Sequence, residues 1–482
     1  MSDFGFIAYL ALAGVIITSL ALFYVKKPEE ACLTIIMAGI LFLPERVAFK
    51  IPKVPPLDRE SMPYLCLLIF IAIRRKSWIK RARVGRGVDL LVFICAAAAI
   101  VTAWLNPDPL HYGKWGPGTH IQGLDLNDGL ALAGEDLMLM GVPFILGRLL
   151  LRDVQQARRL LLTFAVGGLI YSLFIIVELR LSPQMHRWVY GYTARANSFG
   201  QAMRGGGYRP IVFMSHPLAV AIFMTNAVLA AFVLARDKSR LWGRRWPLFA
   251  IYLLLILIAC KCMAAVVYAV VGTLLISFTK PRTQLRVGTA MAILIIIYPA
   301  LRANNLFPVK AVLSVADLAS SDREGSLGFR FENEEELLAK VRQRPAFGWG
   351  GYGRSMVYEK DYGNFVSIAD GFWIITLGVR GAVGALCKFG LLLFPIVNAA
   401  RSFRRIPGKQ ERVLLAGTVV ILMFSALDLL PNGMFLNYPY FLAGGLLGMT
   451  RAFVSPSGSV APLAQGWDRG DIVETRGAVA ER

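Results

Sequence analysis

The chain alternates between apolar runs and short charged segments along nearly its whole length. Backbone groups in hydrocarbon must hydrogen-bond within their own segment, so apolar runs of spanning length are predicted to be helices. The nearly uncharged runs of roughly this length are 4–25, 88–105, 159–179, 211–235, 287–301, 372–397 and 413–430. The pattern therefore predicts an all-α, polytopic bundle of transmembrane helices.

Composition supports this prediction. Hydrophobic residues make up 56% of the chain and the mean hydropathy is +0.56, a balance that water-soluble domains rarely reach. A net charge of +21 could indicate nucleic-acid binding, but the basic residues lie in short loops between the runs, as the positive-inside rule describes. We therefore expect a lipid bilayer around the protein and no nucleic-acid partner.

Basic loops set the expected orientation. The densest is Arg74–Arg86, with seven Lys/Arg in thirteen residues, which the positive-inside rule places in the cytoplasm. Alternation from this loop gives about thirteen spans if 247–279 forms two short helices that turn near Lys261, and about eleven without one weak pair. We therefore expect a transmembrane domain over 1–454, with the N-terminus outside, and a disordered cytoplasmic tail over 455–482.

Three longer segments then lie on the outer side, at 106–128, 180–210 and 302–370. Long connections in compact proteins usually carry function. The last segment contains a predicted short helix at Glu332–Gln343, which has acids in its first turn and stops before Pro345. We expect a functional site to be built from these outer segments.

The segment 180–210 breaks the charge rule, because it carries five arginines and no acid. Arginine binds phosphate oxygens through a planar, permanently charged fork, so the segment indicates a site for a phosphate-bearing ligand. Anchoring to lipid headgroups, or pairing with acids of 302–370, is the alternative. The five are Arg180, Arg187, Arg195, Arg204 and Arg209.

A second cluster joins basic residues of Arg323–Arg330 to the glycine-rich stretch 342–355. The glycines follow no strand and precede no helix, so a nucleotide loop is not supported. A tight loop that presents Trp349 and Tyr352 to a sugar ring is one interpretation, and a simple turn under a helix end is the other.

Acids also gather near the outer membrane boundary, where an ionisable side chain is a functional candidate by default. One of them could be a general base, or each could neutralise an arginine. Asp370 opens the span that follows 302–370, where it also suits a helix N-cap. The set is Glu135, Asp136, Glu178, Asp370 and Asp428. The sequence has no DxD, HExxH or Ser–His–acid signal, so we expect neither metal nor cofactor and no hydrolase chemistry.

Four stretches resemble the O-antigen polymerase and ligase superfamily of bacterial envelopes. The most specific is SLGFRFENEEELLAKVRQRPAFGWGGYGRS (326–355), an arginine, a helix, a proline and a glycine-rich turn. The others are YRPIVFMSHPLA (208–219), ACKCM (259–263) and DGFWIITLGVRGAVG (370–384). With the pattern of spans, the resemblance covers about residues 60–450.

This resemblance implies a GT-C-like, metal-independent glycosyltransferase of the inner membrane that faces the periplasm. Its substrate would be an oligosaccharide carried on undecaprenyl diphosphate. Arg209 and Arg330 are then expected to contact the diphosphate, and Asp370 to be the base or to orient the acceptor. Further substrate contacts are predicted at Arg204, Arg195, Lys261, His216, Arg344, Trp349, Arg354 and Glu178.

One departure favours a polymerase of O-antigen or exopolysaccharide repeat units. Ligases of the superfamily carry a His-Asn type signature where this chain has Ala369–Asp370–Gly371, and no histidine follows residue 216. The alternatives are a ligase that transfers the glycan to a lipid A core or another acceptor, and a flippase or transporter of lipid-linked sugars. A transporter would be expected to contain internal repeats. A polymerase would work beside a repeat-unit flippase and a chain-length regulator.

Overall fold

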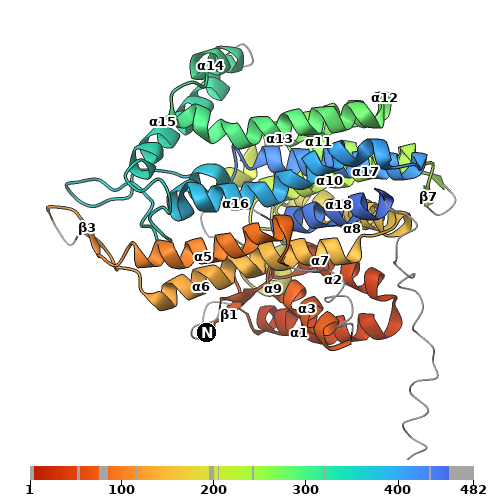
Figure 1. Ribbon diagram of the computed structural model, residues 1–482, viewed down its shortest axis with the longest axis horizontal. Helices are drawn as coiled ribbons and strands as arrows, with labels where there is room; N and C mark the ends of the chain where they lie inside the picture. Colours follow the sequence, from red (N-terminus) through yellow and green to blue (C-terminus); the bar gives the residue numbers. More distant parts are fainter. Residues whose placement is uncertain are drawn as a thin grey trace, which may run out of the picture.

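The computed structural model describes residues 5–50, 55–74, 85–115, 118–194, 200–204, 206–241, 244–317, 321–433 and 436–454. The chain is 71% helix and 5% strand, and most helices run along one common direction (Figure 1). The prediction of a helical polytopic protein is thereby confirmed. Arg195, the predicted tail 455–482 and most of the basic loop Arg74–Arg86 lie outside the described residues.

Within the described residues, eight helical segments are long and apolar enough to cross a membrane. Their outer faces expose apolar side chains, such as Phe6 of α1, which is 79% exposed, as lipid contact requires. The segments are α1 (Phe6–Val25), η1 with α5 (Gly87–Asp89, Leu90–Trp104), α6 through η2 to α7 (Leu126–Asp136, Leu137–Gly141, Val142–Leu150), α8 (Val154–Leu181), α10 (Pro217–Arg236), α13 (Pro281–Ala303), α16 (Phe372–Ser402), which continues into η4 (Phe403–Arg405), and α17 (Lys409–Asp428).

The other predicted spans correspond to shorter helices. They are α2 (Pro28–Phe42), α3 (Met62–Arg74), α11 (Trp246–Ala259), α12 (Met263–Phe278) and α18 (Tyr438–Val454). The prediction of two short helices within 247–279 is confirmed, with Lys261 in the turn between them at φ 55°. Helices of 14 and 16 residues are about 21–24 Å long, less than the hydrocarbon thickness, so their status as spans stays a prediction.

Short antiparallel hairpins and small helices connect the long helices. β3 and α15 lie at one end of the bundle, which we call the α15 end, and β7 lies at the opposite end (Figure 1). The strand pairs are β1 (Ala48–Phe49) with β2 (Leu57–Asp58), β3 (Leu110–Tyr112) with β4 (Thr119–Ile121), β5 (Met203–Arg204) with β6 (Gly207–Tyr208), and β7 (Arg240–Leu241) with β8 (Arg244–Arg245). The small helices are α9 (Met185–Tyr190), η3 (Gly200–Ala202) and α14 (Val309–Asp317).

The helix predicted at Glu332–Gln343 is longer than expected. It is α15, which begins at Ser321 and ends at Val341. Gly325 and Gly328 weaken helix propensity, but α14 packs against α15 and tertiary contact overrides that local cost. The segment 302–370, predicted to lie on the outer side, is therefore about half helical.

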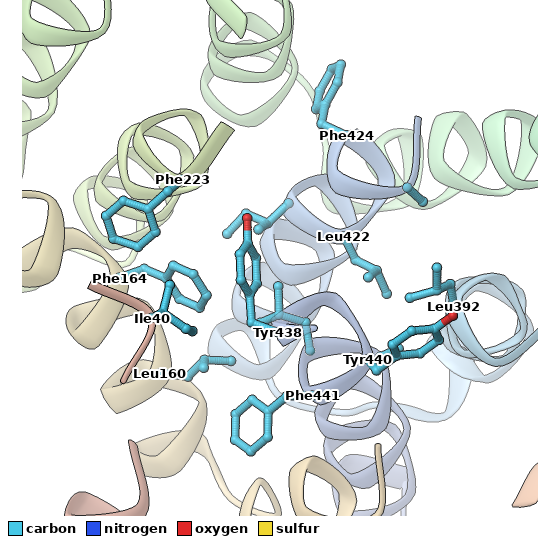
Figure 2. Close-up of a cluster of buried hydrophobic side chains, with 14 of the residues drawn as sticks. Ile40, Leu160, Phe164, Phe223, Leu392, Leu422, Phe424, Tyr438, Tyr440 and Phe441 are labelled. Carbon is cyan, nitrogen blue, oxygen red and sulfur yellow. The ribbon is translucent and has the colours of Figure 1, made fainter. Parts of the chain in front are cut away.

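The core is centred on α18, whose small and aromatic residues are buried against α7, α16 and α17. Figure 2 shows Tyr438, Tyr440 and Phe441 of α18 reaching toward side chains of α2, α8, α10, α16 and α17. The rings of Phe164 and Tyr438 are 5.5 Å apart, and Asn226 donates to the Tyr438 hydroxyl over 2.6 Å. This rigid core carries the loops of the α15 end.

Candidate functional site

Two residues that the sequence singled out form an ion pair at the α15 end. Arg330 of α15 lies 3.3 Å from Asp370, and their side chains are 36% and 40% exposed. Arg330 also donates to the carbonyl of Pro431 in the turn between α17 and α18, over 3.4 Å. The N-cap prediction for Asp370 was wrong, because α16 begins at Phe372 with Gly371 as its cap. The Asp370 carboxylate instead faces the arginine.

Neighbouring contacts fix the position of both members of this pair. Glu334, one turn after Arg330, lies 3.1 Å from Arg302 of α13 in a buried ion pair. Asn333 accepts a hydrogen bond of 2.7 Å from the amide of Ile368, which fixes the segment that leads into Asp370. Burial raises the pKa of Glu334, and Arg302 opposes that shift. The sequence shows that Arg330 and Glu334 are one helical turn apart, but it does not show that Glu334 pairs with Arg302.

A second group of predicted residues meets at the turn between α11 and α12. Lys261 donates to the carbonyl of Arg204 over 3.1 Å, so its ammonium lies over the β5–β6 hairpin. Arg209 follows that hairpin, is 7% exposed, and interacts electrostatically with Cys262 and Arg204. Burial lowers the pKa of Arg209 from its ordinary value, although guanidinium groups stay charged at neutral pH. Three cations thus lie where the β5–β6 hairpin meets this turn.

Tyr268 of α12 lies within electrostatic range of both groups. It interacts electrostatically with Cys262 and also with Arg330 and Asp428. Asp428, at the end of α17, is buried and accepts a hydrogen bond of 2.8 Å from Asn432. We use the name arginine face for the two groups together, namely Arg204, Arg209, Lys261, Arg330 and Asp370.

Neither protein-family models nor curated proteins give a match to this chain. The resemblance to the O-antigen polymerase and ligase superfamily therefore rests on the four quoted stretches. Three of them contribute residues to the arginine face through Arg209, Lys261 and Arg330, and the fourth contributes Asp370.

The structure does not support the prediction that Glu178 contacts a substrate. It is 1% exposed, and its carboxylate accepts hydrogen bonds from the amides of Met185, Ile211 and Val212 over 2.7–2.8 Å. His216 similarly caps α10, because its Nδ1 accepts from the amide of Leu218 over 3.1 Å. We therefore reassign Glu178 to anchoring the loop before α10, and His216 to capping that helix.

Replacing Glu178 by alanine is expected to lower the free energy of unfolding by about 2 kcal/mol, because three buried amides lose a charged acceptor. Thermal unfolding of the purified protein in detergent measures this change. The control is Glu335→Ala on α15, whose side chain is 44% exposed and should change stability by less than about 0.5 kcal/mol. Equal melting temperatures for the two variants would contradict the anchoring role.

The glycine-rich stretch docks into a break in α16. Gly381 has φ 63° and ψ −169°, which interrupts the helix. The amides of Trp349 and Gly350 donate to the carbonyls of Gly378 and Val379, and the amide of Ala382 donates to the carbonyl of Pro345. Gly348 sits so close that an added Cβ would lie 2.6 Å from the Gly381 amide nitrogen. The loop therefore completes the hydrogen bonds that the break leaves open.

This docking favours the interpretation of a turn under a helix end. Trp349 is 7% exposed, and its ring is covered by Lys340 and Arg344, 4.0 and 4.5 Å from the ring centre. Arg354 is fully buried and donates to the carbonyls of Asp108, Gln122 and Trp349. Arg344 donates to Leu105 and Asn106. We therefore reassign Arg344 and Arg354 from substrate binding to joining 342–355 to the segment that begins at Leu105. Trp349 is reassigned to packing beneath Lys340 and Arg344.

Proposed function

We propose that the chain is a membrane glycosyltransferase that polymerises undecaprenyl-diphosphate-linked oligosaccharide units at the periplasmic face of the bacterial inner membrane. The observation that supports this best is the half-exposed pair of Arg330 and Asp370, beside the cations of the arginine face. The proposal includes the GT-C-like architecture with about eleven to thirteen spans, in which the shorter helices also cross the bilayer.

The pair suits the chemistry of glycosyl transfer. An acceptor hydroxyl oxygen forms a bond to the anomeric carbon of the donor, and the bond from that carbon to the diphosphate oxygen breaks. The lipid diphosphate leaves with the bonding electrons, and the cations of the arginine face stabilise its charge. Asp370 takes the proton of the acceptor hydroxyl. Arg330 orients the aspartate through their ion pair until the acceptor arrives.

Reconstitution tests the proposal directly. The full chain in lipid nanodiscs, supplied with an undecaprenyl-diphosphate oligosaccharide, should produce a ladder of longer lipid-linked glycans on a gel. A product that forms only when lipid A core is added would identify a ligase instead. Movement of the substrate across a vesicle membrane without any new glycosidic bond would identify a flippase.

Asp370→Asn is expected to lower the rate of chain extension about a hundredfold, because the amide keeps the shape but accepts no proton. The rate is measured from the gel ladder at saturating substrate. Asp361→Asn, in the same outer segment and also exposed, is the matched control and should retain full activity. Equal rates for the two variants would remove Asp370 from the reaction.

A further inference from the structure

A cavity of about 680 Å³ lies beneath the break in α16, within the size range of ligand pockets. It is bounded by α6, α16, the start of α18 and the glycine-rich loop, and its wall is mostly apolar, with Leu132, Leu139, Met140 and Ile375 among the lining residues. None of the five residues of the arginine face lines it. The cavity is therefore a second candidate site.

One region of this apolar wall carries buried charge. Asp136 lies 2.9 Å from Nε of Arg380 and 2.6 Å from Nζ of Lys388, and the side chains of Asp136 and Arg380 are each 4% exposed. Nη1 of Arg380 is buried and has no hydrogen-bond partner among the described residues. An unsatisfied charged donor in such a place is costly, so it requires an acceptor.

The charges of the cavity do not balance. Lys50, Arg380 and Lys388 line it together with Glu135 and Asp136, which leaves one positive charge in excess among the described lining residues. Glu135 is exposed, so the cavity opens to the surface beside the buried charges. A ligand with one negative charge would neutralise the cavity and supply the missing acceptor for Arg380.

We propose that this cavity binds the phosphate group of a membrane lipid. The phosphate accepts from Arg380, as guanidinium groups favour phosphate oxygens, and the hydrocarbon chain lies against the apolar wall. Two sources share this chemistry, namely the headgroup of an anionic phospholipid and the phosphate of a polyprenyl carrier. The inference stands on the cavity alone and does not depend on glycosyl transfer at the arginine face.

Native mass spectrometry of the delipidated full chain in detergent tests the proposal. The probes are phosphatidylglycerol, undecaprenyl phosphate, their uncharged counterparts diacylglycerol and undecaprenol, and inorganic phosphate. We expect at least one of the two phosphate-bearing lipids to bind more tightly than its uncharged counterpart, and the tighter of them identifies the source. Equal binding of charged and uncharged lipids, or binding of inorganic phosphate as tight as that of either lipid, would overturn the proposal.

Two variants test whether the lipid binds in this cavity. Arg380→Gln should weaken binding of the preferred phosphate lipid about tenfold to a hundredfold, the loss expected when a charged hydrogen bond is removed. Arg342→Gln removes the same charge from a position just after α15, where the side chain is 45% exposed, and should bind normally.

Gly351→Leu is a second variant that leaves the charge network intact. A Cβ at Gly351 would meet only Leu132, at 3.6 Å, so the added side chain can fill the cavity without backbone strain. It should also weaken lipid binding, while thermal unfolding stays within a few degrees of the unmodified protein. Unchanged binding in both Arg380→Gln and Gly351→Leu would show that the lipid binds elsewhere.

Discussion

Alanine at Arg330 is expected to lower glycan extension about a thousandfold, the scale of losing one preorganised donor to a developing anion. Arg330 is 36% exposed, faces Asp370 and is fixed through its neighbour Glu334. Without Arg330, the departing diphosphate loses a stabilising positive charge. Asp370 also loses its ion-pair partner. Single-turnover extension of a lipid-linked oligosaccharide in nanodiscs measures the effect.

The matched control is Arg342→Ala, at the position directly after the same helix. Arg342 is 45% exposed and pairs with Glu335 over 3.0 Å, so its loss removes an equal charge away from the arginine face. Full activity of Arg342→Ala together with normal membrane insertion of Arg330→Ala would assign the loss to the site. Full activity of Arg330→Ala would refute the diphosphate contact.

Gly381→Ala is expected to lower the free energy of unfolding by about 4 kcal/mol, at the upper end of single substitutions. The backbone of Gly381 has φ 63° and ψ −169°, a conformation that is essentially confined to glycine. An added Cβ would also overlap the carbonyl of Ala346 in the docked loop. Loss of the docking should expose 345–350 to protease as well as lower the melting temperature in detergent.

Gly325→Ala is the control for this variant. Gly325 lies in α15 with open space around it, so alanine should be neutral or stabilise the helix by up to about 1 kcal/mol. A melting temperature of Gly381→Ala equal to that of Gly325→Ala would show that the break in α16 is not maintained by the glycine.

The sequence predicted the long helices well, because a run such as 159–179 can satisfy its backbone in a bilayer only as a helix. It also singled out Arg330 and Asp370, which the structure brings together. It did not predict their supports, since Arg302 and Glu334 are 32 residues apart and no local pattern connects them.

The predictions that we revise for Glu178 and Arg354 missed distant contacts in the same way. Glu178 looked like a free acid near the boundary, but the amides of Ile211 and Val212 return to it from more than thirty residues away. Arg354 looked like a ligand arginine, yet it donates to carbonyls of Asp108 and Gln122 in another outer segment. Charge at a boundary indicates a role, and only tertiary contacts decide whether the role is binding or support.

The docked loop limits how this part of the molecule can move. Residues 345–350 exchange backbone hydrogen bonds with Gly378–Val383, so lifting this loop would leave peptide groups of α16 without partners near hydrocarbon. We therefore expect the loop to stay docked on α16 and not to open as a lid. Under the proposed function we expect a large glycan to be accommodated by other parts of the α15 end, while 345–350 stays docked on α16.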